Sequence, residues 1–465
     1  MAPPPEAVFA PDERIDDLVR QARRPVVEMV TERFGTPNRL VAWEALPVDY
    51  GVLEGRVVEA YPETDGTCWR LKVELDAVPE FPKDWPAPLL QGVAVAFLSF
   101  GGKPVSAGGL VDEGENRVGL TVQRFDPGTG VLELAQRLGS PPSAGDRLRL
   151  VGHKLQRGRV AYMRHCVHCH GVAGDGNGPT APYLNPRPRD YRRGIFKFTS
   201  TGPNERPTRD DLKRTIRQGI PGTYMPSFFL LDDGDVEAIV EYVRFLAMRG
   251  EFERRLVDEL ILDYSTEAVA QRVDAGEERS DILDELETFL RDELPETAAF
   301  EVERIANAWR RVERPEALVV PKTPRTPDTF ESRARGRKLF LSKTLKCVDC
   351  HGPTGRGDGP MTEDYQLNTA TNEYYPFPGL VDAWGHPIRP RNLTRGIYRG
   401  GRRPLDIYRR IYVGIKGTPM PSSAAALNEE QIWDLVNYVL SIPYETADTR
   451  RQLDAVAAQL TASEK

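Results

Sequence analysis

The first third of the chain changes from a helical to a strand-like hydrophobic pattern. Residues 12–34 are typical of an amphipathic helix. From residue 51, short apolar runs rich in β-branched and aromatic residues alternate with Gly, Pro, Asp and Asn, which indicates strands joined by turns. The predicted strands cover 56–61, 68–75, 93–100, 117–125, 131–138 and 147–151. This pattern predicts a small all-β domain, a barrel or a sandwich, whose role the sequence does not reveal.

A repeated pattern fills much of the remaining chain. Four stretches recur in the same order: 156–166 with 334–347, 176–179 with 357–360, 187–196 with 389–398, and 219–226 with 414–421. Two copies of one domain explain this best. The segment between them, 251–313, is acidic and helical in pattern, and the prolines that follow it predict a stiff, extended linker.

Each copy contains one C-x-x-C-H sequence, which is the attachment signature of a c-type haem. The residues are Cys166, Cys169 and His170 in the first copy, and Cys347, Cys350 and His351 in the second. Two thiols at this spacing add to the two vinyl groups of the porphyrin, and the adjacent His binds iron. The sequence therefore predicts two covalently attached haems. The fifth cysteine, Cys68, lies in a predicted strand and is expected to be a buried apolar residue.

Two other chemistries use C-x-x-C. A pair can form half of a zinc site, but the two pairs are too far apart in the sequence for a shared ribbon-like site. A pair can also be a thioredoxin-like dithiol, but that motif follows a strand, and no strand is predicted before either pair. Both alternatives remain open, and haem attachment is favoured.

Composition narrows the class of protein. The 465 residues suggest about three domains. The net charge of −7 argues against a nucleic-acid binder. The longest nearly continuous apolar run, 93–100, is far shorter than the roughly 20 residues that span a bilayer. No Walker sequence, H-E-x-x-H motif or nucleophile elbow is present. An electron carrier is thus favoured over an enzyme, and an enzyme remains the alternative.

Each copy resembles a class I cytochrome c, over about 154–250 and 330–447. That family has an N-terminal helix, C-x-x-C-H, haem-wrapping loops, a Met-bearing loop and a C-terminal helix. The resemblance implies C-terminal helices at 235–246 and 429–440, each crossing the N-terminal helix of its copy. The residues expected at the crossings are Gly158, Tyr162 and Tyr242 in the first copy, and Gly336, Phe340 and Tyr438 in the second.

The predicted fold is therefore multidomain: two mostly α-helical cytochrome c domains, an N-terminal all-β domain and a helical linker. The expected segments are an N-terminal helix and linker (1–50), the β-rich domain (51–153), the first cytochrome c domain (154–250), the acidic and Pro-rich linker (251–329), the second cytochrome c domain (330–447) and a C-terminal helix or tail (448–465).

The second axial ligand of each iron follows by elimination among seven methionines. Met225 and Met420 remain, each before a proline in a Gly-rich loop at the same place in the repeat. His/Met ligation raises the haem potential and suits electron transfer. The two methionines could instead be core residues, and His153 or His386 could take the ligand position. Each copy is expected to close its own haem pocket.

Further residues are expected around the haems. Pro179 and Pro360 match the family's proximal proline, whose carbonyl accepts a hydrogen bond from the ligand His. Arg189 and Arg391 are the candidates for pairing with haem propionates, because a guanidinium suits a carboxylate. The second copy also has an aromatic-rich insertion within 361–385. We expect this insertion to pack near the haem or the domain interface, and so to make the two haems unequal.

The sequence thus predicts a dihaem c-type cytochrome that transfers single electrons in a respiratory chain, free or as a subunit of a membrane-bound complex. The expected partners are redox proteins, such as a respiratory oxidase or a quinol-oxidising complex. The alternatives are a peroxidase-like or sulfur-compound-oxidising dihaem enzyme, and a structural redox subunit whose β-domain docks a partner. Haem attachment implies the periplasm or the outer face of the cytoplasmic membrane. Because residues 1–5 carry no export signal, we expect a leader or anchor to be missing, and membrane association only through that anchor or a partner.

Overall fold

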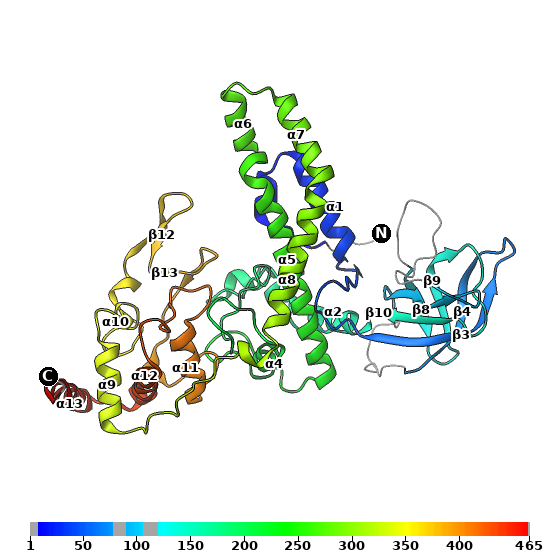
Figure 1. Ribbon diagram of the computed structural model, residues 1–465. Helices are drawn as coiled ribbons and strands as arrows, with labels where there is room; N and C mark the ends of the chain where they lie inside the picture. Colours follow the sequence, from blue (N-terminus) through cyan, green and yellow to red (C-terminus); the bar gives the residue numbers. More distant parts are fainter. Residues whose placement is uncertain (1–7, 78–89, 106–119, 464–465) are drawn as a thin grey trace. The chain divides into compact units, whose positions relative to one another are not determined.

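The computed structural model describes residues 8–77, 90–105 and 120–463 (Figure 1). The chain forms two compact units. The first comprises 1–178, 191–193 and 232–306, and the second comprises 179–190, 194–231 and 307–465. No helix among the described residues is both long enough and apolar enough to cross a membrane.

An antiparallel sheet of six strands forms the β-domain, in the order β5-β10-β3-β4-β9-β8. Its strands are β3 (Val52–Pro62), β4 (Cys68–Leu75), β5 (Ala94–Phe97), β8 (Val122–Asp126), β9 (Val131–Leu138) and β10 (Arg147–Val151). The short strands β6 (Ser99–Phe100) and β7 (Lys103–Pro104) form a separate pair. All six predicted strand regions contain a strand, and positions 117–119 of one prediction lie outside the described residues.

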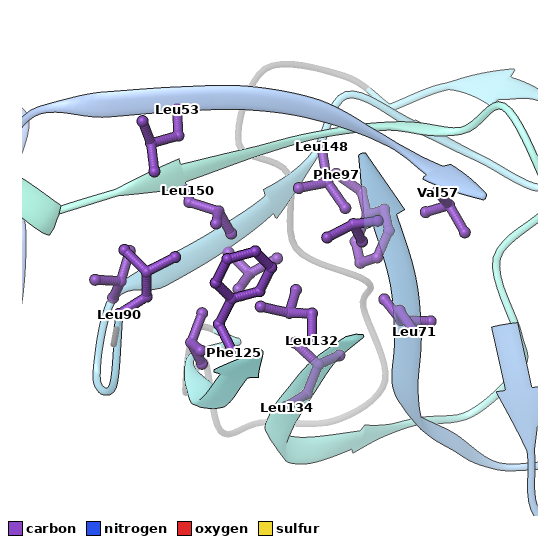
Figure 2. Close-up of a cluster of buried hydrophobic side chains, with 14 of the residues drawn as sticks. Leu53, Val57, Leu71, Leu90, Phe97, Phe125, Leu132, Leu134, Leu148 and Leu150 are labelled. Carbon is purple, nitrogen blue, oxygen red and sulfur yellow. The ribbon is translucent and has the colours of Figure 1, made fainter. Parts of the chain in front are cut away.

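The sheet curves until its edge strands meet. The amide of Val95 donates to the carbonyl of Leu120 at 2.8 Å, and the amide of Val122 donates to Val93 at 2.9 Å. Figure 2 shows the leucine, valine and phenylalanine side chains that fill the interior, Leu132 and Leu148 among them. Cys68 is fully buried in this core, as predicted. Alternation of inward apolar and outward polar residues along each strand creates this one-sided core.

The predicted N-terminal helix is interrupted. A 3₁₀ turn covers Glu13–Asp17, and α1 runs from Arg20 to Phe34. Between them Leu18 is fully buried, and the backbone at Leu18 and Val19 is extended. The amide of Val19 donates to the carbonyl of Tyr264 at 3.0 Å, a long-range bond that replaces the helical one. The prediction of one continuous helix was therefore wrong at this point.

In the first copy, α2 (His153–His165) crosses α5 (Asp233–Tyr264) at Gly158. A Cβ on Gly158 would collide with the carbonyl group of Ala238, so only glycine allows this approach. The rings of Tyr162 and Tyr242 meet with centroids 5.1 Å apart. This crossing confirms the predicted contact.

Helix α5 extends well past the predicted end at residue 246. Its buried apolar residues continue at helical spacing through Phe252, Leu256 and Leu260. The acidic segment then forms α6 (Thr266–Asp274), α7 (Arg279–Asp292) and α8 (Leu294–Arg311). A helical segment was predicted here, but its first part is continuous with the closing helix of the first copy.

The second unit repeats the crossing. Helix α9 (Phe330–Phe340) crosses α12 (Glu429–Ser441) at Gly336, and Phe340 packs on Tyr438 with ring centroids 5.4 Å apart. The C-terminal helix α13 (Ala447–Ser463) packs on α9, where Arg337 pairs with Asp454 at 2.7 Å. This unit also contains α4 (Arg209–Gln218) and α11 (Pro404–Val413).

The proline-rich segment packs along α12. After a 3₁₀ turn at Pro315–Ala317, the amide of Thr323 donates to the Glu429 carboxylate at 2.7 Å. The indole of Trp433 donates to the carbonyl of Thr323 at 3.2 Å. The predicted linker therefore lies against the second copy of the repeat.

The aromatic insertion forms two small hairpins, β11 (Tyr365–Asn368) with β12 (Glu373–Pro378), and β13 (Leu380–Val381) with β14 (Pro387–Ile388). Tyr365 and Tyr374 are exposed on the first hairpin, so for these two residues the expectation of packing was wrong. Trp384, in the second hairpin, does pack, as described below.

Candidate haem-attachment sites

Both C-x-x-C-H sequences form one short helical turn. The turns are α3 (Val167–His170) and α10 (Cys347–His351). Each ends at a glycine with positive φ, 74° at Gly171 and 71° at Gly352, a backbone conformation that other residues adopt at a cost. Because a glycine follows both turns at the same place in the repeat, the backbone leaves both turns in the same conformation.

The chain after each turn folds back through the same set of hydrogen bonds in both copies. In the first copy the amide-to-carbonyl pairs are Gly176 to His170, Gly178 to Cys169 and Tyr191 to Gly174; in the second they are Gly357 to His351, Gly359 to Cys350 and Leu393 to Gly355. The two copies therefore hold their Cys and His residues with one backbone design, although the sequences differ between the bonded positions.

The cysteines and histidines are in a chemical state that suits haem. All four motif cysteines are reduced and half-buried. Burial raises the pKa of Cys166 to about 12 and that of Cys347 to about 11. Burial lowers the pKa of His351, so its ring is neutral and keeps a lone pair for a metal. His170 stacks on Tyr191, with ring centroids 4.8 Å apart.

The ring of His351 has one buried nitrogen whose predicted hydrogen bond can be checked. Nδ1 of His351 makes no hydrogen bond to any residue that the structure describes. The predicted bond to the carbonyl of Pro360 is therefore not formed here. In the described part of the chain, no group of three or more His, Cys, Asp or Glu side chains could hold a metal ion.

The two methionine loops, 219–226 and 414–421, are also built alike. The amide of Ile220 donates to the carbonyl of Met225, and that of Ile415 donates to Met420, both at 3.1 Å. A threonine hydroxyl inside each loop closes it further: Thr223 donates to Ile220 at 2.8 Å, and Thr418 donates to Ile415 at 2.7 Å. Both methionines are half-buried. Equal loops around Met225 and Met420 agree with equal roles.

The predicted site residues are distributed over both units. Cys166, Cys169 and His170 lie in the first unit, whereas Pro179, Arg189 and Met225 lie in the second. All the predicted residues of the second copy lie in the second unit: Cys347, Cys350, His351, Pro360, Arg391 and Met420. Pro179 and Pro360 are exposed.

The alternative ligands are placed less favourably. His153 is the first residue of α2, while the first C-x-x-C-H follows the other end of that helix. At a rise of about 1.5 Å per residue, the length of α2 separates His153 from the motif by about 18 Å. His386 lies in the turn between β13 and β14, where its amide donates to Asp382 at 3.0 Å. Neither belongs to a loop that both copies share.

The two predicted arginines lie in a cationic cluster. The guanidinium carbon of Arg189 lies 3.8 Å from the ring centroid of Trp384, and Nε of Arg391 donates to the carbonyl of Ile397 at 2.9 Å. Sequence reasoning missed two further members, Lys197 and Arg399. Burial lowers the pKa of Lys197 to about 8, and the charges of Arg189 and Arg399 add to the effect. Lys197 and Arg399 occupy equivalent positions in the repeat, so an alignment of the two copies could have identified them.

Within the second unit, residues of the two copies contact each other at the methionine loops. Nη2 of Arg399, from the second copy, donates to the carbonyl of Gly222 in the first methionine loop at 3.4 Å. A Cβ on Gly222 would lie 2.7 Å from Cζ of Arg391. Residues of the second copy therefore contact the methionine loop of the first.

The family model for cytochrome c matches residues 155–247 and 333–443. These matches contain both C-x-x-C-H sequences and both methionine loops, so the chain has two cytochrome c domains, which imply haem c as the cofactor. No curated protein matches the chain. Among solved structures, it is similar to a chain of the Kuenenia stuttgartiensis reducing HAO-like protein complex Kustc0457/Kustc0458, with 25% identity over 62% of this chain and 96% of that chain, and a TM-score of 0.42.

Proposed function

We propose, starting from the two cytochrome c domains, that this protein carries two covalently attached haems and transfers single electrons in a respiratory chain. The observation that best supports this proposal is the equal construction of the two methionine loops. If each iron has a Met ligand, neither iron has an open position for a substrate. This suits an electron carrier, whereas a peroxidase-like enzyme needs an open position.

Each group of residues has its own task in this proposal. Bound haem supplies a one-electron iron couple. Cys166, Cys169, Cys347 and Cys350 would anchor the macrocycles through thioether bonds, and His170 and His351 would bind iron through imidazole nitrogen. Met225 and Met420 would provide a thioether ligand to each iron, which favours ferrous iron and raises the potential. The cationic cluster with Arg189 and Arg391 holds the propionates, because buried carboxylates need charged partners.

We place the protein in the periplasm or at the outer face of the cytoplasmic membrane, where c-type haem is attached. It works free or as a subunit of a membrane-bound complex, and it exchanges electrons with a respiratory oxidase or a quinol-oxidising complex.

The ligand assignment is tested by Met225→Ala and Met420→Ala in the full-length haem protein. Each variant should convert one haem to a form that binds cyanide and should lower the potential of that haem, because the thioether is lost. Met163→Ala is the matched control, since Met163 is a half-buried methionine on α2 ahead of the first motif.

Two results would contradict the proposal. Unchanged spectra and potentials in both variants would make His153 or His386 the better ligands. Rapid reaction of the unaltered protein with peroxide or cyanide would show an open iron and favour the dihaem enzyme.

A further inference from the structure

Lys416, in the methionine loop of the second copy, binds a segment of the first copy. Its Nζ donates to Oγ1 of Thr199 at 2.7 Å, to Oγ1 of Thr201 at 3.2 Å and to the carbonyl of Glu205 at 2.6 Å. All three acceptors belong to residues 199–205 of the first copy, and all lie in the second unit with Lys416. One ammonium group thus joins the two copies four residues before Met420.

Comparing the copies shows that the loop itself does not need this lysine. The equivalent residue in the first methionine loop is Pro221. That loop nevertheless forms the same internal bonds, from Ile220 to Met225 and from Thr223 to Ile220. The side chain of Lys416 therefore has a task outside the fold of its own loop.

The segment that carries the acceptors of Lys416 is bound by a buried carboxylate at Ser200, between Thr199 and Thr201. Oδ2 of Asp211 accepts from the amide of Ser200 at 2.8 Å and from its hydroxyl at 3.0 Å. Thr201 is fully buried and pairs with Leu318 in an isolated β-bridge. The segment that receives Lys416 is thus ordered by contacts of its own, which makes it a firm support for a loop.

Further contacts between the copies lie beside this bond. A Cβ on Gly417, the residue after Lys416, would lie 2.9 Å from Nη1 of Arg189, which belongs to the first copy. It would also lie 2.6 Å from Cζ3 of Trp384. Arg189 therefore contacts the second methionine loop, as Arg391 contacts the first.

We propose that Lys416 is a positioning residue that holds the Met420 loop against the first copy, so that closure of the second haem site depends on residues of the first. The proposal rests on the proposed function, because it takes Met420 as an iron ligand. It predicts that changes at Thr199, far from the second motif in sequence, alter ligand exchange at the second haem.

The size of the effect follows from the bonds that would be lost. Opening the loop breaks hydrogen bonds from a charged donor, and losing them shifts an opening equilibrium by about tenfold or more. Lys416→Met keeps the length and apolar stem of the side chain and removes the ammonium. Thr199→Val keeps the shape of the threonine and removes one acceptor, so it should shift the equilibrium by about threefold.

The test is a titration of the oxidised, full-length haem protein with imidazole, followed by the visible spectrum. Imidazole replaces a methionine ligand only when the loop opens. The transition that moves to a much lower imidazole concentration in Met420→Ala belongs to the second haem. Lys416→Met should raise the imidazole affinity of that haem about tenfold or more, and Thr199→Val about threefold. Lys343→Met, at an exposed lysine of the same copy, is the charge-matched control and should change nothing.

The proposal is overturned if Lys416→Met and Thr199→Val both leave the imidazole affinity of the second haem equal to that of the control. Thr199→Val decides the question if Lys416→Met does not fold. The ligand role of Met420 and the positioning role of Lys416 are tested separately. If Met420→Ala leaves the spectrum unchanged, the ligand assignment is wrong. If Met420→Ala opens the iron but the other two variants have no effect, only the role of Lys416 is wrong.

Discussion

Gly336→Ala probes the helix crossing on which the second cytochrome domain is built. A Cβ at this position would lie 2.6 Å from the carbonyl carbon of Asp434 and 2.7 Å from Cβ of Tyr438. Carbon atoms in contact are about 3.5–4.0 Å apart, so α9 and α12 would have to separate by about 1 Å. The obstructing atoms belong to the backbone and Cβ of α12, and no rotamer change can move them away.

Two opposing effects decide whether Gly336→Ala raises or lowers the free energy of unfolding. Replacing Gly by Ala inside a helix gains about 1 kcal/mol from helix propensity. Forcing an extra methyl group into a packed interface costs about 1–3 kcal/mol and occasionally more. Separation of the helices would also weaken the contact between Phe340 and Tyr438, and aromatic pairs contribute about 0.5–1.5 kcal/mol. We expect a net loss of about 1–3 kcal/mol in the free energy of unfolding of this domain.

The measurement is guanidinium unfolding of the full-length haem protein, followed by the absorbance of the haems. Gly202→Ala serves as the control because its Cβ would meet only Cγ of Glu205, at 3.5 Å. The control should change stability by less than about 0.5 kcal/mol. If Gly336→Ala is as stable as the control, or gains the full propensity term, the reasoning about this close crossing is refuted.

Three further predictions follow from the sites. The mass of the denatured, exported protein should include two haems, because four thiols are placed for four thioether bonds, whereas a haem-free mass with bound zinc would contradict the whole assignment. A redox titration should resolve two one-electron steps. Deletion of 362–384 should shift mainly the potential of the second haem, because Trp384 packs on the methionine loop of the second copy. One common potential that the deletion leaves unchanged would contradict this. Burial lowers the pKa of Lys416 from 10.5 to about 8, and among the charges facing it Asp211 and Glu205 raise the pKa while Arg206 lowers it further. The unfolded chain therefore binds this proton more tightly than the folded one, so between pH 8 and 10.5 the free energy of unfolding should rise with pH, by up to about 3 kcal/mol relative to Lys416→Met. Equal pH profiles of the two proteins would show that Lys416 is not buried as a cation.

Local signals predicted those parts of the protein that depend on short stretches of chain. The strands β4, β9 and β10 have the predicted bounds, because alternation and turn residues act over a few positions. The haem motifs needed no tertiary information, since the spacing of Cys and His is imposed by the macrocycle. Gly158 and Gly336 marked the helix crossings in advance, because only glycine allows two backbones to come that close.

Only the tertiary structure decided what depends on contacts between distant segments. The break in the N-terminal helix follows from a bond between Val19 and Tyr264, and the periodicity of residues 12–34 carries no trace of it. The length of α5 was underestimated, because its acidic C-terminal half looks like a linker until its apolar stripe finds partners. The sequence by itself determined two attachment motifs and two equal methionine loops. That Lys416 holds one of these loops against the other copy was decided by folding alone, because a lysine in a loop looks like a solvated charge until its acceptors lie next to it.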